Sequence, residues 1–63
     1  MVFAIQELDP GRKIKLKGGI VAEVKDNPRD GSWLVVRYIS VPDDPVSVGR
    51  EELASADDVV ELL

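Results

Sequence analysis

The stretch that decides the fold is KIKLKGGIVAEVKDNPRDGSWLVVRY, residues 13–38. Its first part alternates strictly, so that Ile14 and Leu16 fall on one face of an extended chain and three lysines fall on the other. A repeat of two residues is typical of a strand with one buried face, because successive side chains on a strand point to opposite sides. The same spacing on a helix would spread the lysines around its axis. The pattern therefore predicts a strand from Lys13 to Lys17.

Two turn signals divide the rest of this stretch into antiparallel strands. The pair Gly18-Gly19 predicts a two-residue hairpin turn, because glycine readily adopts the left-handed conformations that such turns require. Residues 26–31, DNPRDG, combine an Asx-type start with a proline and a closing glycine, which is typical of a hairpin tip. Strands are therefore expected over residues 20–25 and 33–39, the second rich in β-branched and aromatic side chains.

The expected strands share one interior. The alternation sends Ile14, Leu16, Val24 and Val36 to a common side, which predicts the core of the sheet. On the other side, Val21 falls among charged residues and indicates a bulge or a surface covered on both faces. Glu23 can lie opposite a lysine of the preceding strand. Such an exposed pair contributes about 0.2–1 kcal/mol, so it would set the register more than the stability.

The pattern changes after residue 40. Prolines at positions 42 and 45 interrupt the strand pattern, because proline cannot donate to a sheet ladder. We expect a short strand at residues 46–48 and then one tight turn of helix within residues 49–56, with Leu53 turned inward. Residues 57–63 are compatible with a closing strand or a C-terminal helix. The strand is favoured because Val59 and Val60 are poor helix formers.

The composition limits the class of protein. The 63 residues make a single domain, and a domain of this size buries only about 60% of the surface that its unfolded chain exposes. Hydrophobic residues make up 44% and charged residues 32%, which is typical of a folded soluble protein. Cysteine and histidine are both missing, which removes disulfides, thiolate metal sites and the usual general base near neutral pH. We therefore expect no catalysis, cofactor or metal site, and no small-molecule substrate is indicated.

Two acidic pairs, Asp43-Asp44 and Asp57-Asp58, have the residue type of calcium ligands or of an acid/base pair. Adjacent residues on a strand point to opposite faces, and neither pair lies in the spaced loop that oxygen-ligand cages use. We interpret both pairs as turn and capping residues. The serines have no histidine to activate them, so a serine nucleophile has no support.

Five short strands with hairpin tips and one helical turn before the last strand predict an all-β fold, a small five-stranded antiparallel barrel. The segment PGRKIKLKGGIVAEVKDN, residues 10–27, resembles the strand, glycine loop and strand of KOW-type modules. The segment DGSWLVVRY, residues 30–38, followed by a short helical turn at residues 50–53, is similar to the later strands of Tudor and other SH3-like barrels. The resemblance implies that residues 1–63 form one SH3-like barrel, and its KOW-type part implies RNA binding.

The candidate binding residues follow from the uneven charge. Residues 11–37 carry seven basic against three acidic side chains, a net charge of +4, whereas residues 38–63 carry a net charge of −6. One interpretation is a positive surface for phosphates, with an aromatic ring stacked on a base. The residues of that surface are Lys13, Lys15, Lys17, Lys25 and Arg37, with Trp33 or Tyr38 as the ring. The other interpretation is a solvated sheet face whose lysines protect an edge from pairing, and the total charge of −4 favours it.

The single tryptophan allows two interpretations. A core or core-edge position is favoured for Trp33, because so small a domain needs its large apolar area. If instead Trp33 and Tyr38 are exposed, they are the first anchors for a partner to be tested.

We therefore predict a small non-catalytic protein-interaction module or accessory subunit, whose dipolar charge orients it on a partner protein or on a second copy. The first alternative is nucleic-acid binding through the KOW-like basic hairpin, and the second is an accessory subunit of an electron-transfer complex. The apolar run at residues 2–5 would add a strand over the barrel edge or pair with another copy. This run is too short for a signal peptide, so a cytoplasmic protein without membrane contact is expected.

Overall fold

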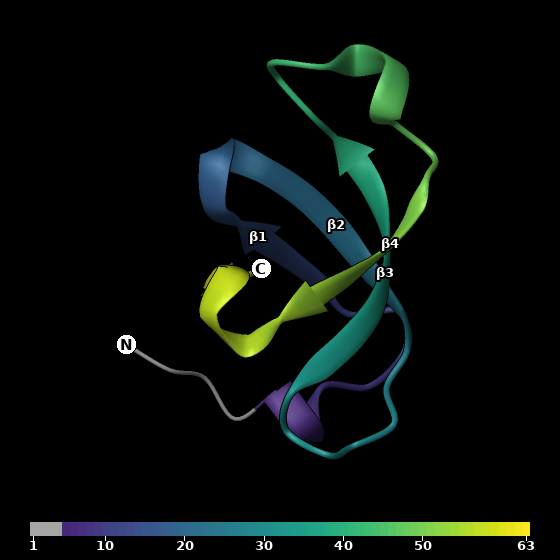
Figure 1. The fold of residues 1–63 in the computed structure, drawn as a ribbon, viewed down its shortest axis with the longest axis vertical. Helices are drawn as coiled ribbons and strands as arrows, with labels where there is room; N and C mark the ends of the chain where they lie inside the picture. Colours follow the sequence, from purple (N-terminus) through teal and green to yellow (C-terminus); the bar gives the residue numbers. More distant parts are fainter. Residues whose placement is uncertain (1–4) are drawn as a thin grey trace.

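The computed structural model describes residues 5–63, which form one antiparallel sheet (Figure 1). Its strands are β1 (Lys13–Leu16), β2 (Ile20–Asp26), β3 (Trp33–Ser40), β4 (Glu51–Ser55) and β5 (Val59–Leu62). Their spatial order is β4-β3-β2-β1-β5. The all-β class and the three antiparallel strands expected between residues 13 and 39 are confirmed.

Short 3-10 turns accompany the strands. One of them, η1 (Ile5–Glu7), precedes β1, and the others lie between strands: η2 (Lys17–Gly19), η3 (Pro45–Ser47) and η4 (Ala56–Asp58). The last of them precedes β5, but it lies at residues 56–58 and not within residues 49–56, where the helical turn is expected. The closing strand is confirmed, and the end of the chain forms β5 and not a C-terminal helix.

The core lies on one side of the curled sheet. All four predicted core residues, Ile14, Leu16, Val24 and Val36, are buried, and every strand adds at least one buried side chain. Ile5 of η1 and Leu8 also join this cluster, which they reach from outside the sheet. The N-terminal strand expected at residues 2–5 mostly lies outside the described residues. Its last member, Ile5, begins η1 rather than a strand.

The sheet is strongly twisted, so that β4 crosses β3 in Figure 1, but it does not close on itself. Within residues 5–63, β4 pairs only with β3 and β5 pairs only with β1. The expected five-stranded barrel is therefore an open, curled sheet with two free ends. This opening leaves a groove between β4 and η2.

The segment between β3 and β5 departs from the prediction. Residues 51–55 form an edge strand instead of a helical turn, and Leu53 is exposed instead of buried. The alternation was hard to see because the only buried residue of this strand is the small Ala54, which lies opposite Leu34.

The strand expected at residues 46–48 is also wrong, because this part of the chain forms η3. Pro45 occupies the start of the turn, where its missing N–H is not needed. The hydroxyl of Ser47 donates to Asp44 at 2.6 Å and the N–H of Ser47 donates to the Asp44 carbonyl at 3.0 Å. The hydrogen bonds of this turn therefore outweigh the strand preference of Val46 and Val48.

The two hairpins are built as the turn residues predict, with one difference. The glycine pair has φ values of 82° and 78°, in the left-handed region, but the connection is three residues long because Lys17 belongs to it. The second hairpin tip uses Asx-type bonds, including one from the Arg29 N–H to Asn27 Oδ1 at 2.8 Å. The bulge indicated by Val21 is present as a shift of register between Val21 and Ala22.

Candidate functional site

The outer face of the sheet carries an alternating row of charges across four strands. Lys13 of β1 lies opposite Glu23 of β2, Glu23 lies opposite Arg37 of β3, and Arg37 lies opposite Glu51 of β4. The Arg37 guanidinium is 3.2 Å from the Glu51 carboxylate. We call these four residues the charge ladder. The expected position of Glu23 opposite a lysine of the preceding strand is confirmed, and that lysine is Lys13.

The remaining basic candidates are also separated from one another. Lys15 lies between Val21 of β2 and Glu61 of β5, and the ammonium of Lys25 is 3.9 Å from the Glu23 carboxylate. Lys17 is not on the strand face at all, because it belongs to η2. The structure therefore places acidic side chains among the predicted basic residues instead of gathering those residues into one uninterrupted positive surface.

Beside the charge ladder, the outer face becomes apolar. Val35 of β3 lies directly opposite Leu53 of β4, and Trp33 is two residues before Val35 on the same face. Trp33 is 49% exposed and Leu53 is 64% exposed. We call Trp33, Val35 and Leu53 the apolar patch. The core position favoured for Trp33 is wrong, because its strand turns this residue outward.

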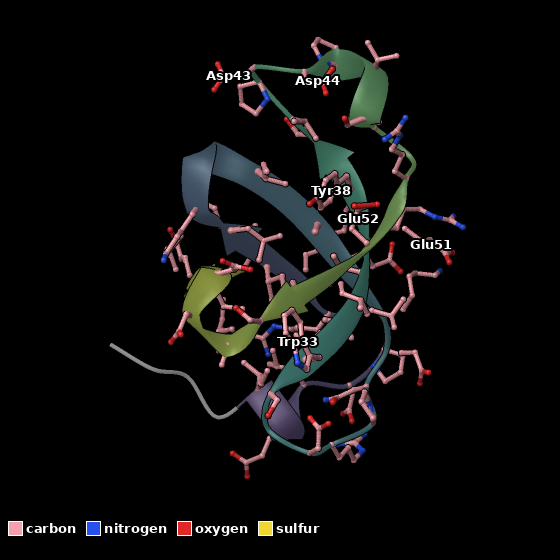
Figure 2. The ribbon with its side chains drawn as sticks, in the orientation of Figure 1. Trp33, Tyr38, Asp43, Asp44, Glu51 and Glu52 are labelled. Atoms are coloured by element: carbon pink, nitrogen blue, oxygen red, sulfur yellow. The ribbon has the colours of Figure 1, made fainter. Side chains whose placement is uncertain are left out.

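Tyr38 does not join Trp33. The two residues are five positions apart on β3, so their side chains project from opposite faces of the sheet. Figure 2 shows both, with Trp33 near the beginning of β3 and Tyr38 near its end. Tyr38 is half-buried against the core. The two aromatic candidates are therefore separate features and not one paired anchor.

Tyr38 lines a groove of about 190 Å³ on the inner side of the open sheet. Its lining residues come from β1, η2, β2, β3, β4 and η4 and are Leu16, Lys17, Ile20, Tyr38, Leu53, Ala54 and Asp58. The groove lies between β4 and η2, where the strands of a closed barrel would meet. Leu53 also borders a shallow depression on the surface of β4, together with Val35, Glu51 and Glu52. The edge of β4 therefore lies between two concave surfaces.

In each acidic pair, the second residue has the turn or capping role predicted for the pair. Asp44 accepts a hydrogen bond from the Ser47 hydroxyl in η3, and Asp58 accepts one from the Ser55 N–H at 3.2 Å. Asp43 and Asp44 lie on the loop that projects from the sheet (Figure 2). Across residues 5–63, carboxylates do not gather in groups of three or more that could hold a metal ion.

Sequence reasoning missed two contributors to this region. Leu53 was expected inside, although its alternation with Ala54 would have placed it outward if residues 51–55 had been interpreted as a strand. The groove had no sequence signal, because its lining residues come from six elements. In the described part of the chain, the helical turns are all too short to cross a membrane.

The chain matches no protein-family model, and it has no significant match among curated proteins or solved structures. Its functional interpretation therefore depends on the surface described above.

Proposed function

We propose that this chain is a small protein-interaction module that binds its partner through the apolar patch of β3 and β4. The observation that carries the proposal is the exposure of Trp33 and Leu53 on neighbouring positions of paired strands. Exposed apolar side chains that lie together on a rigid surface and are rimmed by charges are typical of protein contact sites. Tryptophan is among the residues that most often dominate binding energy at such sites.

The adjacent charge ladder supports the same proposal. Arg37 and Glu51 border the patch on the outer face and already neutralise each other at 3.2 Å. A partner would therefore contact apolar side chains at the centre and paired charges at the rim, which is the usual anatomy of a protein interface. The strand order and the 3-10 turn before β5 also support the narrower proposal of an SH3-like fold.

Nucleic-acid binding receives less support from the geometry. Phosphate binding gains affinity from basic side chains that are free to replace counterions. Here Glu23 lies between Lys13 and Arg37, and Glu61 lies opposite Lys15. The basic hairpin is thus partly neutralised by its own sheet neighbours.

A pull-down from the native host with patch variants tests the proposed function. The wild-type protein, Trp33→Ser and Leu53→Ser would be immobilised separately, with Val60→Ser as the matched control. Val60 is also an exposed apolar residue on an edge strand, but it lies on β5 at the other end of the sheet. We expect a partner that the wild type and Val60→Ser retain and that both patch variants lose.

Nuclease treatment of the extract separates the remaining alternatives. Retention that survives nuclease and depends on the patch supports a protein partner. Retention that disappears after nuclease supports the KOW-like alternative. Equal retention by all the variants would show that the apolar patch is not the contact surface.

A further inference from the structure

The edge of β4 has main-chain groups available for another strand. Hydrogen bonds from the Tyr38 N–H to the Arg50 carbonyl and from the Ala56 N–H to the Ser32 carbonyl join the two ends of β4 to β3. In an antiparallel pair, alternate residues bond to the neighbour and the residues between them point away. The N–H and C=O groups of Glu51, Leu53 and Ser55 therefore face the free edge.

One of these groups is already used. The Ser55 N–H donates to the Asp58 carboxylate at 3.2 Å, which ends the free edge at η4. Within residues 5–63, the N–H and C=O groups of Glu51 and Leu53 have no hydrogen-bond partner on this side. Both residues are exposed. An added strand therefore has a two-residue docking edge whose hydrogen-bonding groups face solvent.

The groove beside this edge is suited to one apolar side chain. Leu16, Ile20 and Ala54 give it apolar walls, and its volume is about 190 Å³. Pockets for drug-sized ligands usually have about 300–1,000 Å³, so this groove is too small for such a molecule. A strand lying along β4 would send alternate side chains toward the groove and toward the apolar patch. The groove and the patch are thus the two sides of one docking edge.

The charge of β4 and η4 selects the kind of strand. Residues 51–58 carry four carboxylates and no basic side chain. Glu52 lies opposite Val36, and therefore on the same face as Tyr38 and the groove, as Figure 2 also shows. Lys17 is the one cation among the groove residues, and it comes from η2 rather than from β4. Charge complementarity therefore favours a basic segment along β4.

A second copy of this chain fits the edge poorly. If two β4 strands paired through Glu51 and Leu53, the two Glu52 side chains would lie directly opposite each other, and like charges in that position are destabilising. If they paired about Leu53, Glu51 would lie opposite Ser55, whose N–H already bonds to Asp58. The edge is therefore better suited to a different protein.

We propose that β4 binds an extended basic segment of a partner protein as an added antiparallel strand. The main chain of the segment pairs with Glu51 and Leu53, one apolar side chain enters the groove, and a lysine or arginine lies beside Glu52. Main-chain bonds supply affinity in this type of recognition, and alternate side chains supply specificity. This inference rests on the proposed protein-binding function and names the class of its partner.

The test is an NMR titration of the whole chain with the synthetic peptide acetyl-Lys-Val-Leu-Val-Lys-amide. On a strand, its lysines and leucine lie on one face, toward Glu52 and the groove, and its valines lie on the other, toward the apolar patch. We expect the Glu51 and Leu53 amides to shift and their hydrogen exchange to slow by about tenfold, because those N–H groups become bonded. The Glu52 and Ala54 amides already face β3 and should change little. Glu52→Lys should weaken binding about fivefold, as expected for a lost exposed ion pair.

Two controls separate strand pairing from simple charge attraction. The same peptide with N-methyl groups on alternate residues keeps its charge but cannot pair, so it should not protect either amide. Leu53→Pro removes one N–H at the free edge, which β3 does not use. The sheet should remain folded, because proline is tolerated at such edge positions. The variant should not bind the peptide. If Leu53→Pro does not fold, the N-methylated peptide still decides the question with the wild-type protein.

The outcomes distinguish this inference from the proposed function. Shifts limited to Trp33 and Val35, without protection of Glu51 and Leu53, would leave the binding surface in place and overturn the added strand. Equal binding by the matched peptide acetyl-Glu-Val-Leu-Val-Glu-amide would overturn the basic partner. Absence of any binding up to millimolar peptide would overturn the strand proposal, whereas the pull-down with patch variants decides the proposed function independently.

Discussion

The side-chain amide of Asn27 donates a 2.8 Å hydrogen bond to the main-chain carbonyl of Ile5, 22 residues earlier in the chain. The same nitrogen donates to the Leu8 carbonyl, also at 2.8 Å, and the Asn27 oxygen accepts from the Arg29 N–H. Asn27 is buried, so these bonds replace water for each group involved. One side chain at the hairpin tip thereby holds the η1 segment, with Ile5 and Leu8, against the core.

Replacement of Asn27 by alanine should strongly destabilise the domain. The variant leaves the Leu8 carbonyl without its donor in a buried position and removes one of the two donors to the Ile5 carbonyl, which keeps its bond from the Leu8 N–H. We expect the free energy of unfolding to fall by about 2–3 kcal/mol. Urea denaturation followed by circular dichroism measures this change. Asp43→Ala, at an exposed loop position, is the control and should have little effect. Equal stability of the two variants would contradict the anchoring role of Asn27.

The glycine turn between β1 and β2 gives a second prediction. Gly19 has φ +78°, a conformation that a residue with Cβ adopts only with strain. We expect Gly19→Ala to lower the free energy of unfolding by about 1–2 kcal/mol. Gly19→Asn should recover part of the loss, because asparagine tolerates the left-handed region better. Thermal unfolding compares the two variants, and identical values would mean that backbone strain is not the cause.

The charge ladder predicts a salt-dependent effect on stability. Glu23→Lys would place a positive charge between Lys13 and Arg37, and we expect a loss of about 1 kcal/mol at low ionic strength. Added salt should reduce the loss, because exposed charges are screened. The double variant Glu23→Lys with Lys13→Glu should recover part of it. Denaturant midpoints at two salt concentrations provide the measurement, and a loss that salt does not change would point to packing.

Two leucines on adjacent strands test the orientation of β4. Leu34 is fully buried, and Leu34→Ala should cost about 2–5 kcal/mol, which approaches the whole stability of a domain this small. We therefore expect a largely unfolded protein at 25 °C by circular dichroism. Leu53→Ala should remain folded and lose less than about 1 kcal/mol, because this side chain is exposed. A large loss from Leu53→Ala would support the inward position that the helical turn implied.

Most of the sheet could be predicted, because its first three strands combine strict alternation with strong turn residues. Ile14 and Leu16 alternate with lysines, and the loop at residues 26–31 contains proline, glycine and three Asx residues. These signals are local, so they act before any tertiary contact forms. The segment at residues 51–55 lacks these signals. Ala54 is too small to mark a buried face, and the adjacent glutamates at positions 51 and 52 interrupt the alternation of polar and apolar residues.

The candidate site was predicted less well. The lysines share a face in the sequence pattern, but the carboxylates that neutralise them belong to other strands, and only the register brings Glu23 and Glu61 beside them. The position of Trp33 shows the same limit. Its residue type favours burial, whereas its position on β3 opposite Ser55 turns it outward.

The sequence alone therefore determines an all-β chain, its first two hairpins and the residues that alternate toward a core, because strand period and turn chemistry depend on near neighbours. The tertiary structure decides which residues become surface partners. It brings Val35 beside Leu53, gathers the groove from six elements, and leaves β4 without a neighbour on one side. The physical reason is that cross-strand pairing joins residues far apart in the chain, and its register and open ends are set by packing of the whole sheet rather than by any local pattern.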